Sequence, residues 1–405
     1  MSRSSPAVPR AVDCSTRVAV VARLSQPGGV QSVVLSLIKG LNERGIIPDI
    51  VWDSPPNREM LEEKGVQAGY MPVRFTLPSS FVEQAPITLK YTFRIANLFT
   101  SSQVPRAYNF YYIFYNGFLV DDGTPHVRYL SGPPLLPQLD AVSPGLRGLP
   151  YRAIRALYRR YLKNRLPVYE YHRDSPYVIN AQYTADLFEE AHGVRLPVIN
   201  PPIDLSGRSF SDHDIHRRDT ITYFSRFIDY KRPEMVLSLA ERFPGQRVLL
   251  MGGVKPENRA YYQQLRDLAR QKKLANAVFL DNPNDQRVKE ELSRTRFYVF
   301  PGVNEHFGMA TAEAIGSGAV PYVHDSGGQR EIVPDPELRF TDDEFIEKFA
   351  RLVALSSEEL NDIRKRLAAH VQQFSEAVFI EKMLAFMSRS QESEFEENEL
   401  QAVSA

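Results

Sequence analysis

The sequence predicts an α/β protein with two doubly wound parallel sheets, and three observations lead to this expectation. Short apolar runs of β type alternate with helical patterns at spacings of about 20 to 25 residues, which favours parallel strands joined by helices. The 405 residues are enough for two or three domains of common size. Residues 197–204, PVINPPID, have the proline density of a boundary between domains.

The individual elements follow from the period of the apolar positions and from the turn residues between them. We expect strands at 17–24, 49–53, 107–115, 126–130, 175–180, 220–227, 246–253, 277–281, 297–303 and 319–325. We expect helices at 33–41, 58–64, 183–192, 233–243, 258–273, 286–294, 309–315, 343–355, 357–374 and 377–387.

Composition excludes several classes of protein. Basic and acidic side chains balance at 49 each, so the overall charge gives no sign of nucleic-acid binding. The single cysteine, Cys14, excludes an internal disulfide framework and a cysteine-rich metal site, and it favours a reducing, cytoplasmic setting. No window has about 18 uninterrupted apolar residues, and the N-terminus lacks the apolar core of a signal peptide. We expect a cytoplasmic protein that is soluble or attached only to a membrane surface.

The main candidate site lies between a strand that ends at residue 300 and a helix that begins at residue 309. The backbone N–H groups of Phe307, Gly308 and Met309 lie at the helix N-terminus, which attracts an anion or a polyhydroxyl ligand. Glu305 lies in the loop, and Glu313 follows eight residues later, so both carboxylates can face one ligand. Carboxylates accept hydrogen bonds from the hydroxyl groups of sugars.

Two cations follow another strand of the second half. Arg226 ends the strand at 220–227, and Lys231 comes five residues later, near the start of the next helix. Charge-assisted hydrogen bonds from two such cations suit a diphosphate group. A pair of surface cations is the alternative.

Glycines follow two further strands. Gly28 and Gly29 separate the first strand from its helix, at the edge where open α/β sheets bind ligands, although a plain tight turn has the same pattern. Gly253 closes the strand at 246–253, where it either narrows a nucleobase pocket or makes a turn.

The spacing of Glu305 and Glu313, with NEHFG at 304–308 and HDSGG at 324–328, resembles the signature of the retaining glycosyltransferases of family 4. The residues of these two motifs are similar to those in the lineage of the eukaryotic lipid-linked-oligosaccharide mannosyltransferases. The resemblance implies the GT-B fold, with two Rossmann-like domains that face each other across a cleft. It implies that Glu305 holds hydroxyls of the donor hexose, next to His306, and that Glu313 holds the ribose of the nucleotide.

The same resemblance assigns the other candidates. Arg226 and Lys231 occupy the positions of an arginine and a lysine that stabilise the departing diphosphate in this family. The loop with Gly28 and Gly29 would approach the donor phosphate and the acceptor. Relatives bind the nucleobase largely through backbone atoms at the position of Asn282 and Pro283. The side chains at this position therefore say little about which nucleobase binds.

The expected organisation combines the pattern with the resemblance. A disordered segment at 1–16 precedes an acceptor domain at 17–199 and a donor domain at 200–375. In the family the last helix, here 376–390, returns to the first domain. The acidic tail at 391–405 is expected to be disordered.

The chain departs from the family in its first half. Many relatives have a histidine beside the donor sugar, whereas Asn116 and Ser131 follow the corresponding strands here. These two residues are therefore candidates for acceptor binding only. In a same-face mechanism the donor phosphate itself can take the acceptor proton, so no side-chain base is required.

A metal is not expected. Asp212, His213 and Asp214, with His216 nearby, resemble the Asp-x-Asp metal motif of the other major glycosyltransferase fold. They do not follow a strand, so a solvated loop is the preferred interpretation. We expect no metal ligands and no cofactor beyond the nucleotide sugar as co-substrate.

Residues 147–165 contain seven basic residues and no acidic one, with apolar residues at helical spacing. Such a helix can lie on an anionic membrane surface or on a lipid-phosphate acceptor. The alternative is a packed helix whose arginines are simply solvated.

The sequence therefore predicts a retaining hexosyltransferase that uses a nucleotide-diphosphate sugar, with GDP-mannose slightly favoured over a UDP-sugar. The acceptor would be a hydroxyl group of a glycan, a lipid-linked sugar or a small molecule. The alternatives are a UDP-sugar-dependent transferase or a pseudo-glycosyltransferase that acts on a small soluble acceptor. A further alternative is a scaffold that binds a nucleotide sugar without catalysis.

Overall fold

The computed structural model describes residues 16–26, 28–74, 78, 108–114, 124–132, 176–208, 210–211, 215 and 218–388. Several expected features lie outside these residues. They are the segment 1–15 with Cys14, the candidate Asn116, the basic stretch 147–165, the motif residues Asp212, His213, Asp214 and His216, and the tail at 391–405.

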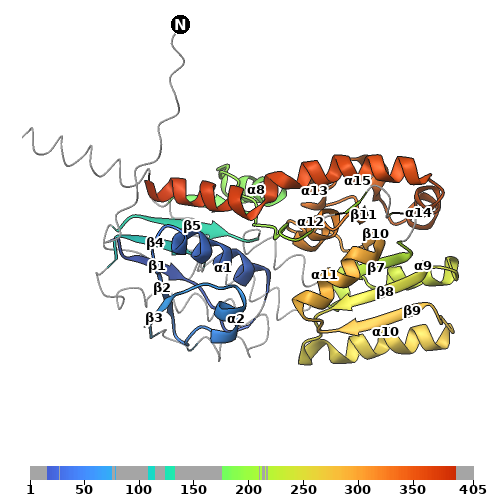
Figure 1. Ribbon diagram of the computed structural model, residues 1–405, viewed down its shortest axis with the longest axis horizontal. Helices are drawn as coiled ribbons and strands as arrows, with labels where there is room; N and C mark the ends of the chain where they lie inside the picture. The colour runs from blue at the N-terminus through green and yellow to red at the C-terminus, as the bar shows by residue number, and fades with distance from the viewer. Residues whose placement is uncertain are drawn as a thin grey trace, which may run out of the picture. The chain divides into compact units, whose positions relative to one another are not determined.

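The chain divides into two compact units. In Figure 1 the strands of the first unit run from blue through teal to green, and this unit also includes the red end of the C-terminal helix. Among the described residues, the first unit holds those up to Ile179, then Phe188–Ile199 and those from Phe379 to Ser388. The second unit holds Asn180–Leu187 and Asn200–Val378.

The first unit is built on a six-stranded parallel sheet with the order β3-β2-β1-β4-β5-β6. Its strands are β1 (Val18–Val21), β2 (Asp49–Trp52), β3 (Gly69–Pro72), β4 (Phe110–Ile113), β5 (His126–Leu130) and β6 (Tyr177–Ile179). Its helices include α1 (Gly29–Asn42) and α2 (Arg58–Glu63), and α8 (Gln182–His192) continues from the second unit into the first.

The second unit repeats this order in six parallel strands, β12-β11-β10-β7-β8-β9. The strands are β7 (Thr220–Phe224), β8 (Arg247–Gly252), β9 (Ala277–Asp281), β10 (Thr295–Phe300), β11 (Val320–His324) and β12 (Arg339–Phe340). The helices include η3 (Asp229–Lys231), α9 (Glu234–Arg242), α10 (Arg259–Gln271), α11 (Asp285–Arg294), α12 (Met309–Gly316), α13 (Gln329–Ile332), α14 (Phe345–Val353) and α15 (Ser357–Val371).

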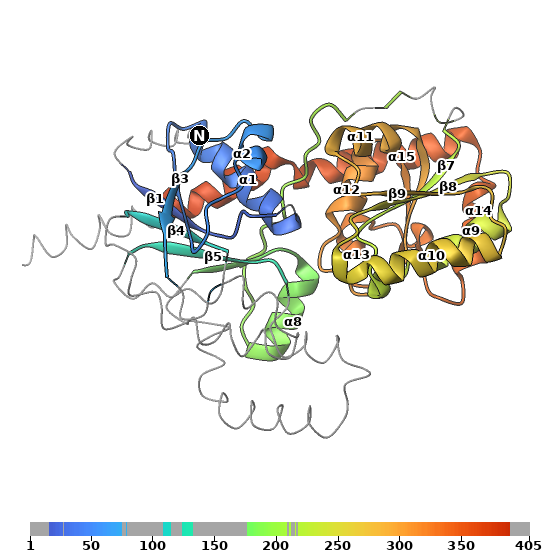
Figure 2. The same ribbon diagram turned by 90° about the horizontal axis from the view of Figure 1, so that it is seen from below.

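Both sheets have the strand order of the Rossmann fold, so the prediction of two doubly wound parallel sheets is confirmed. In the second unit α9 and α10 cover one face of the sheet, and α12 and α15 cover the other (Figures 1 and 2). The order reverses between β7 and β10, which are neighbours although about seventy residues separate them. That switch point is where ligands bind in such sheets.

Two strands were not expected from the sequence. β3 has a glycine at one end and a proline at the other, and its residues are only partly buried, so it lacks the apolar run of the central strands. β12 has two residues, which is too short for any period to be visible. Both lie at the edge of a sheet, where pairing with one neighbour is enough to hold the strand.

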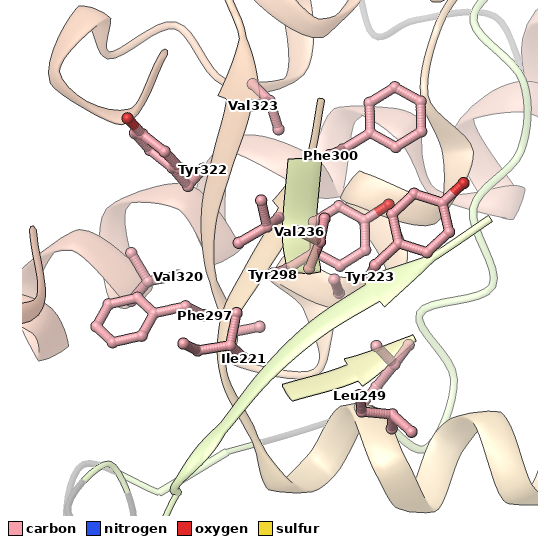
Figure 3. Close-up of a cluster of buried hydrophobic side chains, with 14 of the residues drawn as sticks. Ile221, Tyr223, Val236, Leu249, Phe297, Tyr298, Phe300, Val320, Tyr322 and Val323 are labelled. Atoms are coloured by element: carbon pink, nitrogen blue, oxygen red, sulfur yellow. The ribbon is translucent and has the colours of Figure 1, made fainter. Parts of the chain in front are cut away.

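The core of the second unit fills the space around the switch point. Tyr223 of β7 and Phe300 of β10 stack with their ring centroids 6.4 Å apart, beside the completely buried Tyr298 (Figure 3). Burial of one large apolar side chain contributes about 1.5 to 3 kcal/mol to folding. The ends of β7 and β10 therefore form a stable platform for the loops that follow them.

Residues 376–388 form a helix whose apolar side lies in the core of the first unit. The helix comes so close to α1 that a Cβ atom on Gly40 would lie 2.3 Å from Ile380 Cγ2. Only glycine fits at this crossing. In the part of the chain that the structure describes, no helix combines the length and the apolar character that a membrane crossing needs.

Candidate active site

The loops that follow β7 and β10 meet at the switch point of the second sheet. The loop after β7 carries Arg226 and leads to η3, whose last residue is Lys231, and the loop after β10 carries Glu305. The structure thus brings together the two cations expected at the diphosphate and the carboxylate expected at the donor hexose.

Lys231 and Glu305 form an ion pair between Nζ and Oε2. The two side chains are 10% and 21% exposed, so water screens the pair weakly. The Lys231 ammonium group also lies 5.0 Å from the centroid of the Phe300 ring, which adds a cation–π contact. These contacts fix the lysine at the end of β10.

Glu305 is the carboxylate of this pair, and several groups act on its pKa. Burial raises the pKa, but the Lys231 charge and hydrogen bond lower it, and the nearby His306 and Arg226 charges lower it further. The net effect is a pKa below the ordinary value of 4.5. Glu305 is therefore ionised at neutral pH, so it can accept hydrogen bonds but cannot donate a proton.

Arg226 lies at the surface beside this pair. Its guanidinium group donates to the Tyr230 hydroxyl at 3.3 Å, and its backbone carbonyl accepts from the Tyr223 hydroxyl at 3.0 Å. The backbone is thus fixed from the core, while the charged group stays open to a ligand.

Three neighbouring loops are hydrogen-bonded in a row at the ends of β7, β8 and β9. Phe227 N–H donates to the Gly253 carbonyl at 3.0 Å, and Asn282 N–H donates to the Gly252 carbonyl at 2.8 Å. A Cβ atom on Gly252 would lie 1.7 Å from the Ser225 carbonyl oxygen, and the φ angle of Gly252 is 153°. The approach of these loops therefore depends on a glycine at position 252.

The nucleobase candidates Gly253, Asn282 and Pro283 lie on this row of loops. The Asn282 side chain accepts from Val254 N–H at 2.9 Å, and its backbone is left-handed with a φ of 49°. The amide oxygen of Asn282 thus holds the loop together, which leaves mainly backbone and exposed atoms for a ligand. Pro283 follows and is half-buried.

The helix α12 begins at Met309, with Gly308 before it at a φ of 110°. A Cβ atom on Gly308 would lie 2.7 Å from the side-chain nitrogen of the completely buried Gln329. Glycine is therefore needed at the start of this helix. The ring of Phe307 packs against Phe374 at 5.2 Å, so only the backbone of Phe307 can serve a ligand.

Glu313 has a cation partner that sequence reasoning missed. The Arg208 guanidinium lies 3.4 Å from the Glu313 carboxylate, donates to Ser317 Oγ at 2.9 Å and donates to the Asp204 carbonyl at 2.8 Å. Its side chain is only 6% exposed. Neither a motif nor a periodic pattern marks Arg208, because it lies in an irregular segment.

The Gly-Gly pair of HDSGG packs on the Glu305 loop. Gly328 N–H donates to the Glu305 carbonyl at 2.7 Å, and a Cβ atom on Gly328 would lie 2.3 Å from the His306 carbonyl. Gly327 is equally close, since its Cβ would lie 2.4 Å from the Glu305 carbonyl. The two motifs are therefore one structural unit, in which HDSGG supports NEHFG.

The remaining candidates lie in the first unit. Gly28 precedes α1 and Gly29 is its first residue, so both lie at the carboxyl end of β1 as expected. A Cβ atom on Gly28 would lie 2.6 Å from the Gln31 side chain. Ser131 directly follows β5 and is half-buried, whereas Asn116 lies outside the described residues.

No group of three or more metal-ligating His, Cys, Asp or Glu side chains gathers within the described ranges. The motif residues Asp212, His213, Asp214 and His216 lie outside those ranges. Independence of metal therefore stays a prediction.

The two parallel six-stranded sheets of Rossmann order form a GT-B fold, which similar solved structures share. Residues 208–371, which lie in the second unit, match the family described as glycosyl transferases group 1.

Solved structures support the fold over nearly the whole chain. HepE of Anabaena, solved with UDP and glucose, is 17% identical with a TM-score of 0.64, and the match covers 92% of this chain and 99% of HepE. Sucrose-phosphate synthase of Thermosynechococcus elongatus is 13% identical with a TM-score of 0.67, with 93% and 100% covered. At these identities the similarity concerns the fold.

The curated relatives include mannosyltransferases. GDP-Man:Man(3)GlcNAc(2)-PP-Dol alpha-1,2-mannosyltransferase of Dictyostelium discoideum is 24% identical over 234 residues, which are 52% of this chain and 46% of that protein. D-inositol 3-phosphate glycosyltransferase of Mycobacteroides abscessus is 25% identical over 170 residues, 39% of this chain and 38% of that protein. The matches thus span less than half of either relative.

Proposed function

We propose that this protein is a retaining hexosyltransferase that takes its sugar from a nucleotide-diphosphate donor. The observation that carries the proposal is the meeting of Lys231, Arg226 and Glu305 at the switch point of the second sheet. This sheet belongs to the segment that matches the glycosyl transferases group 1 family. Two cations and an ionised carboxylate at the carboxyl ends of neighbouring strands suit a ligand with a diphosphate and hydroxyl groups.

The proposed chemistry assigns a different task to each residue. Arg226 and Lys231 donate to the diphosphate oxygens and stabilise the negative charge that grows as the bond from the sugar C1 to the diphosphate breaks. The carboxylate of Glu305 accepts from hydroxyls of the hexose and fixes the ring. The acceptor hydroxyl oxygen bonds to C1 on the face that the diphosphate leaves, and its proton passes to a phosphate oxygen.

GDP-mannose is the favoured donor in this proposal, ahead of a UDP-sugar. The support is the similarity to mannosyltransferases whose names include GDP-Man, together with the residues of the NEHFG and HDSGG motifs. The proposed acceptor is a hydroxyl group of a glycan or of a lipid-linked sugar. We also propose that the reaction requires no metal.

The experiment uses donors labelled with ¹³C at C1 and reads the product by NMR. GDP-mannose, UDP-glucose and UDP-N-acetylglucosamine are each offered with octyl α-mannoside or inositol 3-phosphate, in the presence of EDTA. The proposal expects transfer from GDP-mannose with an α-configured product and little transfer in Glu305→Gln. A β-configured product would contradict retention, and transfer from a UDP-sugar alone would contradict the donor.

The proposed setting is the cytoplasmic surface of a membrane, which the basic stretch 147–165 would contact. This stretch lies outside the described residues, so its composition alone supports the idea. Flotation with vesicles that contain phosphatidylserine tests it. Unchanged flotation after neutralisation of Arg155, Arg159 and Arg160 would contradict the membrane contact.

A further inference from the structure

The two residues of the central ion pair each adjoin a residue in a left-handed conformation. Arg232, with a φ of 56°, directly follows Lys231, and Asn304, with a φ of 55°, directly precedes Glu305. Residues other than glycine rarely adopt this conformation unless the surroundings hold them there. The contacts of Arg232 and Asn304 therefore bear on the geometry of the ion pair.

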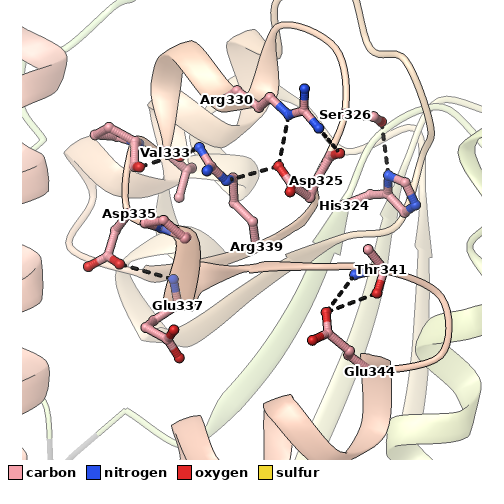
Figure 4. Close-up of polar contacts among 12 residues, drawn as sticks. His324, Asp325, Ser326, Arg330, Val333, Asp335, Glu337, Arg339, Thr341 and Glu344 are labelled. Carbon is pink, nitrogen blue, oxygen red and sulfur yellow. Dashed lines mark hydrogen bonds and ion pairs between the residues drawn. The ribbon is translucent and has the colours of Figure 1, made fainter.

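These contacts form one continuous series, which we name the His324 bridge. Asn304 N–H donates to Ser326 Oγ at 2.8 Å, and Ser326 Oγ lies 2.9 Å from His324 Nδ1 (Figure 4). His324 Nε2 lies 3.4 Å from Asp342 Oδ1, and the same oxygen forms a 2.7 Å ion pair with Arg232. The bridge thus links the residue before Glu305 with the residue after Lys231.

The centre of the bridge is held firmly. The His324 side chain is 13% exposed, and its ring packs edge-on against Phe340 with centroids 5.6 Å apart. Ser326 continues into the glycine pair whose Gly328 N–H donates to the Glu305 carbonyl at 2.7 Å. A change at His324 therefore reaches the backbone of Asn304, the residue before Glu305, through two hydrogen bonds.

The partners of the two ring nitrogens favour one tautomer of the neutral ring. Nε2 lies 3.4 Å from the Asp342 carboxylate, which can only accept, so Nδ1 carries no proton and accepts from the Ser326 hydroxyl group. The proton of the neutral ring lies on Nε2, which faces Asp342. A second proton on Nδ1 would turn this acceptor into a donor, so the hydrogen bond to Ser326 would reverse and the Ser326 hydroxyl hydrogen would have to turn to another acceptor.

Four charged groups act on this ring, and burial acts with them. Burial lowers the pKa of His324 from its ordinary value of 6.5, Arg232 and Arg330 lower it further, and Asp342 and Asp325 raise it. The net pKa is lowered. Asp325 is itself held by Arg330 at 2.8 Å (Figure 4). The ring is therefore neutral at neutral pH.

We propose that His324 is a positioning residue, whose neutral ring holds the Asn304 and Arg232 backbones so that Lys231 and Glu305 can receive the donor. The proposal rests on the proposed function, because it assigns a purpose to the same site. His324 acts through Ser326 and Asp342 and does not touch the donor itself.

The first measurement needs no donor. In protein with ¹⁵N-labelled asparagine, the Asn304 amide resonance is followed from pH 8 to pH 5 in the wild type and in Ser326→Ala. The proposal expects the resonance to titrate with the pKa of the His324 ring and expects Ser326→Ala to abolish this titration. A resonance that does not titrate, or that titrates equally in Ser326→Ala, would overturn the proposal.

The second measurement follows the binding of GDP and UDP over the same pH range. Wild-type affinity should fall as the pH decreases through the pKa of His324, and we call this fall the acid limb. His324→Gln should bind roughly ten- to a hundredfold more weakly at pH 7.5, and its affinity should not show the acid limb. The matched control is His370→Gln, on α15, which should keep both the affinity and the acid limb. A His324→Gln variant that binds as the wild type does would overturn the proposal.

The two measurements separate the proposal from the proposed function. If the wild type binds neither diphosphate, the proposed function fails, and the Asn304 titration still decides whether the bridge exists. If the wild type binds a diphosphate and the Asn304 resonance does not titrate, only the positioning role fails. Ser326→Thr, which keeps the hydroxyl group, should restore the titration that Ser326→Ala lacks.

Discussion

The Lys231 ammonium group lies against the Glu305 carboxylate at the point where the strand order of the second sheet reverses. The two residues come from loops about seventy positions apart in the chain, yet they share one weakly hydrated site. Each charge therefore stabilises the other, and loss of either partner leaves a charge with little water around it.

The first prediction concerns this pair. Lys231→Met should lower the free energy of unfolding by about 3 kcal/mol, because Glu305 stays behind as an uncompensated charge. Lys231→Met combined with Glu305→Gln should recover part of that loss. Urea unfolding of the two single variants and the double variant checks this. Strictly additive losses would show that the two charges do not interact.

A second prediction concerns pH. The pKa of Glu305 is lower in the folded protein than its ordinary value of 4.5. Its contribution to stability is therefore complete above about pH 5.5 and is lost as pH falls through the folded-state pKa. The stability difference between the wild type and Glu305→Gln should shrink over this acid range. A difference that stays constant from pH 7 to pH 3 would contradict the lowered pKa.

A third prediction compares two glycines. Gly252→Ala should lower the free energy of unfolding by more than about 2 kcal/mol, because its φ is 153° and the new Cβ would lie 1.7 Å from the Ser225 carbonyl oxygen. Gly245→Ala is the matched control, since no atom lies within 4 Å of its Cβ position. It should change stability by less than about 1 kcal/mol. Equal effects of the two substitutions would refute the close approach of the loops.

A fourth prediction concerns Arg208. Loss of its guanidinium in Arg208→Ala should raise the KM for the donor roughly tenfold, because Glu313 loses the group that orients its carboxylate. Arg208→Lys should recover little, since an ammonium group cannot reach Glu313, Ser317 and the Asp204 carbonyl together. Steady-state kinetics check both variants. Arg366→Ala, which removes an exposed guanidinium paired with Asp335, should leave the KM unchanged.

The fold could be predicted well because the buried strands carry uninterrupted apolar runs. β5 and the edge strand β9 begin and end at the expected residues. β10 begins two residues earlier than expected, and the other expected strands are somewhat shorter than expected. The polar or short edge strands β3 and β12 have no such runs. β3 and β12 are held by backbone hydrogen bonds to a neighbouring strand, and such pairing requires no apolar pattern in the strand's own sequence.

The site was predictable where a residue belongs to a motif. Lys231 and Glu305 lie in recognisable loops, and the prediction that both follow strands of the second sheet is confirmed. Arg208 and Asp342 were not found, because each lies in an irregular segment and meets its partner only through the tertiary fold. His324 belongs to the HDSGG motif, but its link to Ser326 and Asp342 becomes visible only in three dimensions.

The measurement that tests the central claim most directly is calorimetric titration with GDP, UDP and ADP in the presence of EDTA. It is made on the wild type, on Arg226→Ala and on the control Arg270→Ala, whose guanidinium pairs with Asp267 at the surface. We predict that one diphosphate binds the wild type selectively and that Arg226→Ala weakens this binding about ten- to a hundredfold, the value of a charged hydrogen bond. Absence of binding to the wild type, or equal affinities in all three proteins, would contradict a diphosphate site at the switch point of the second sheet.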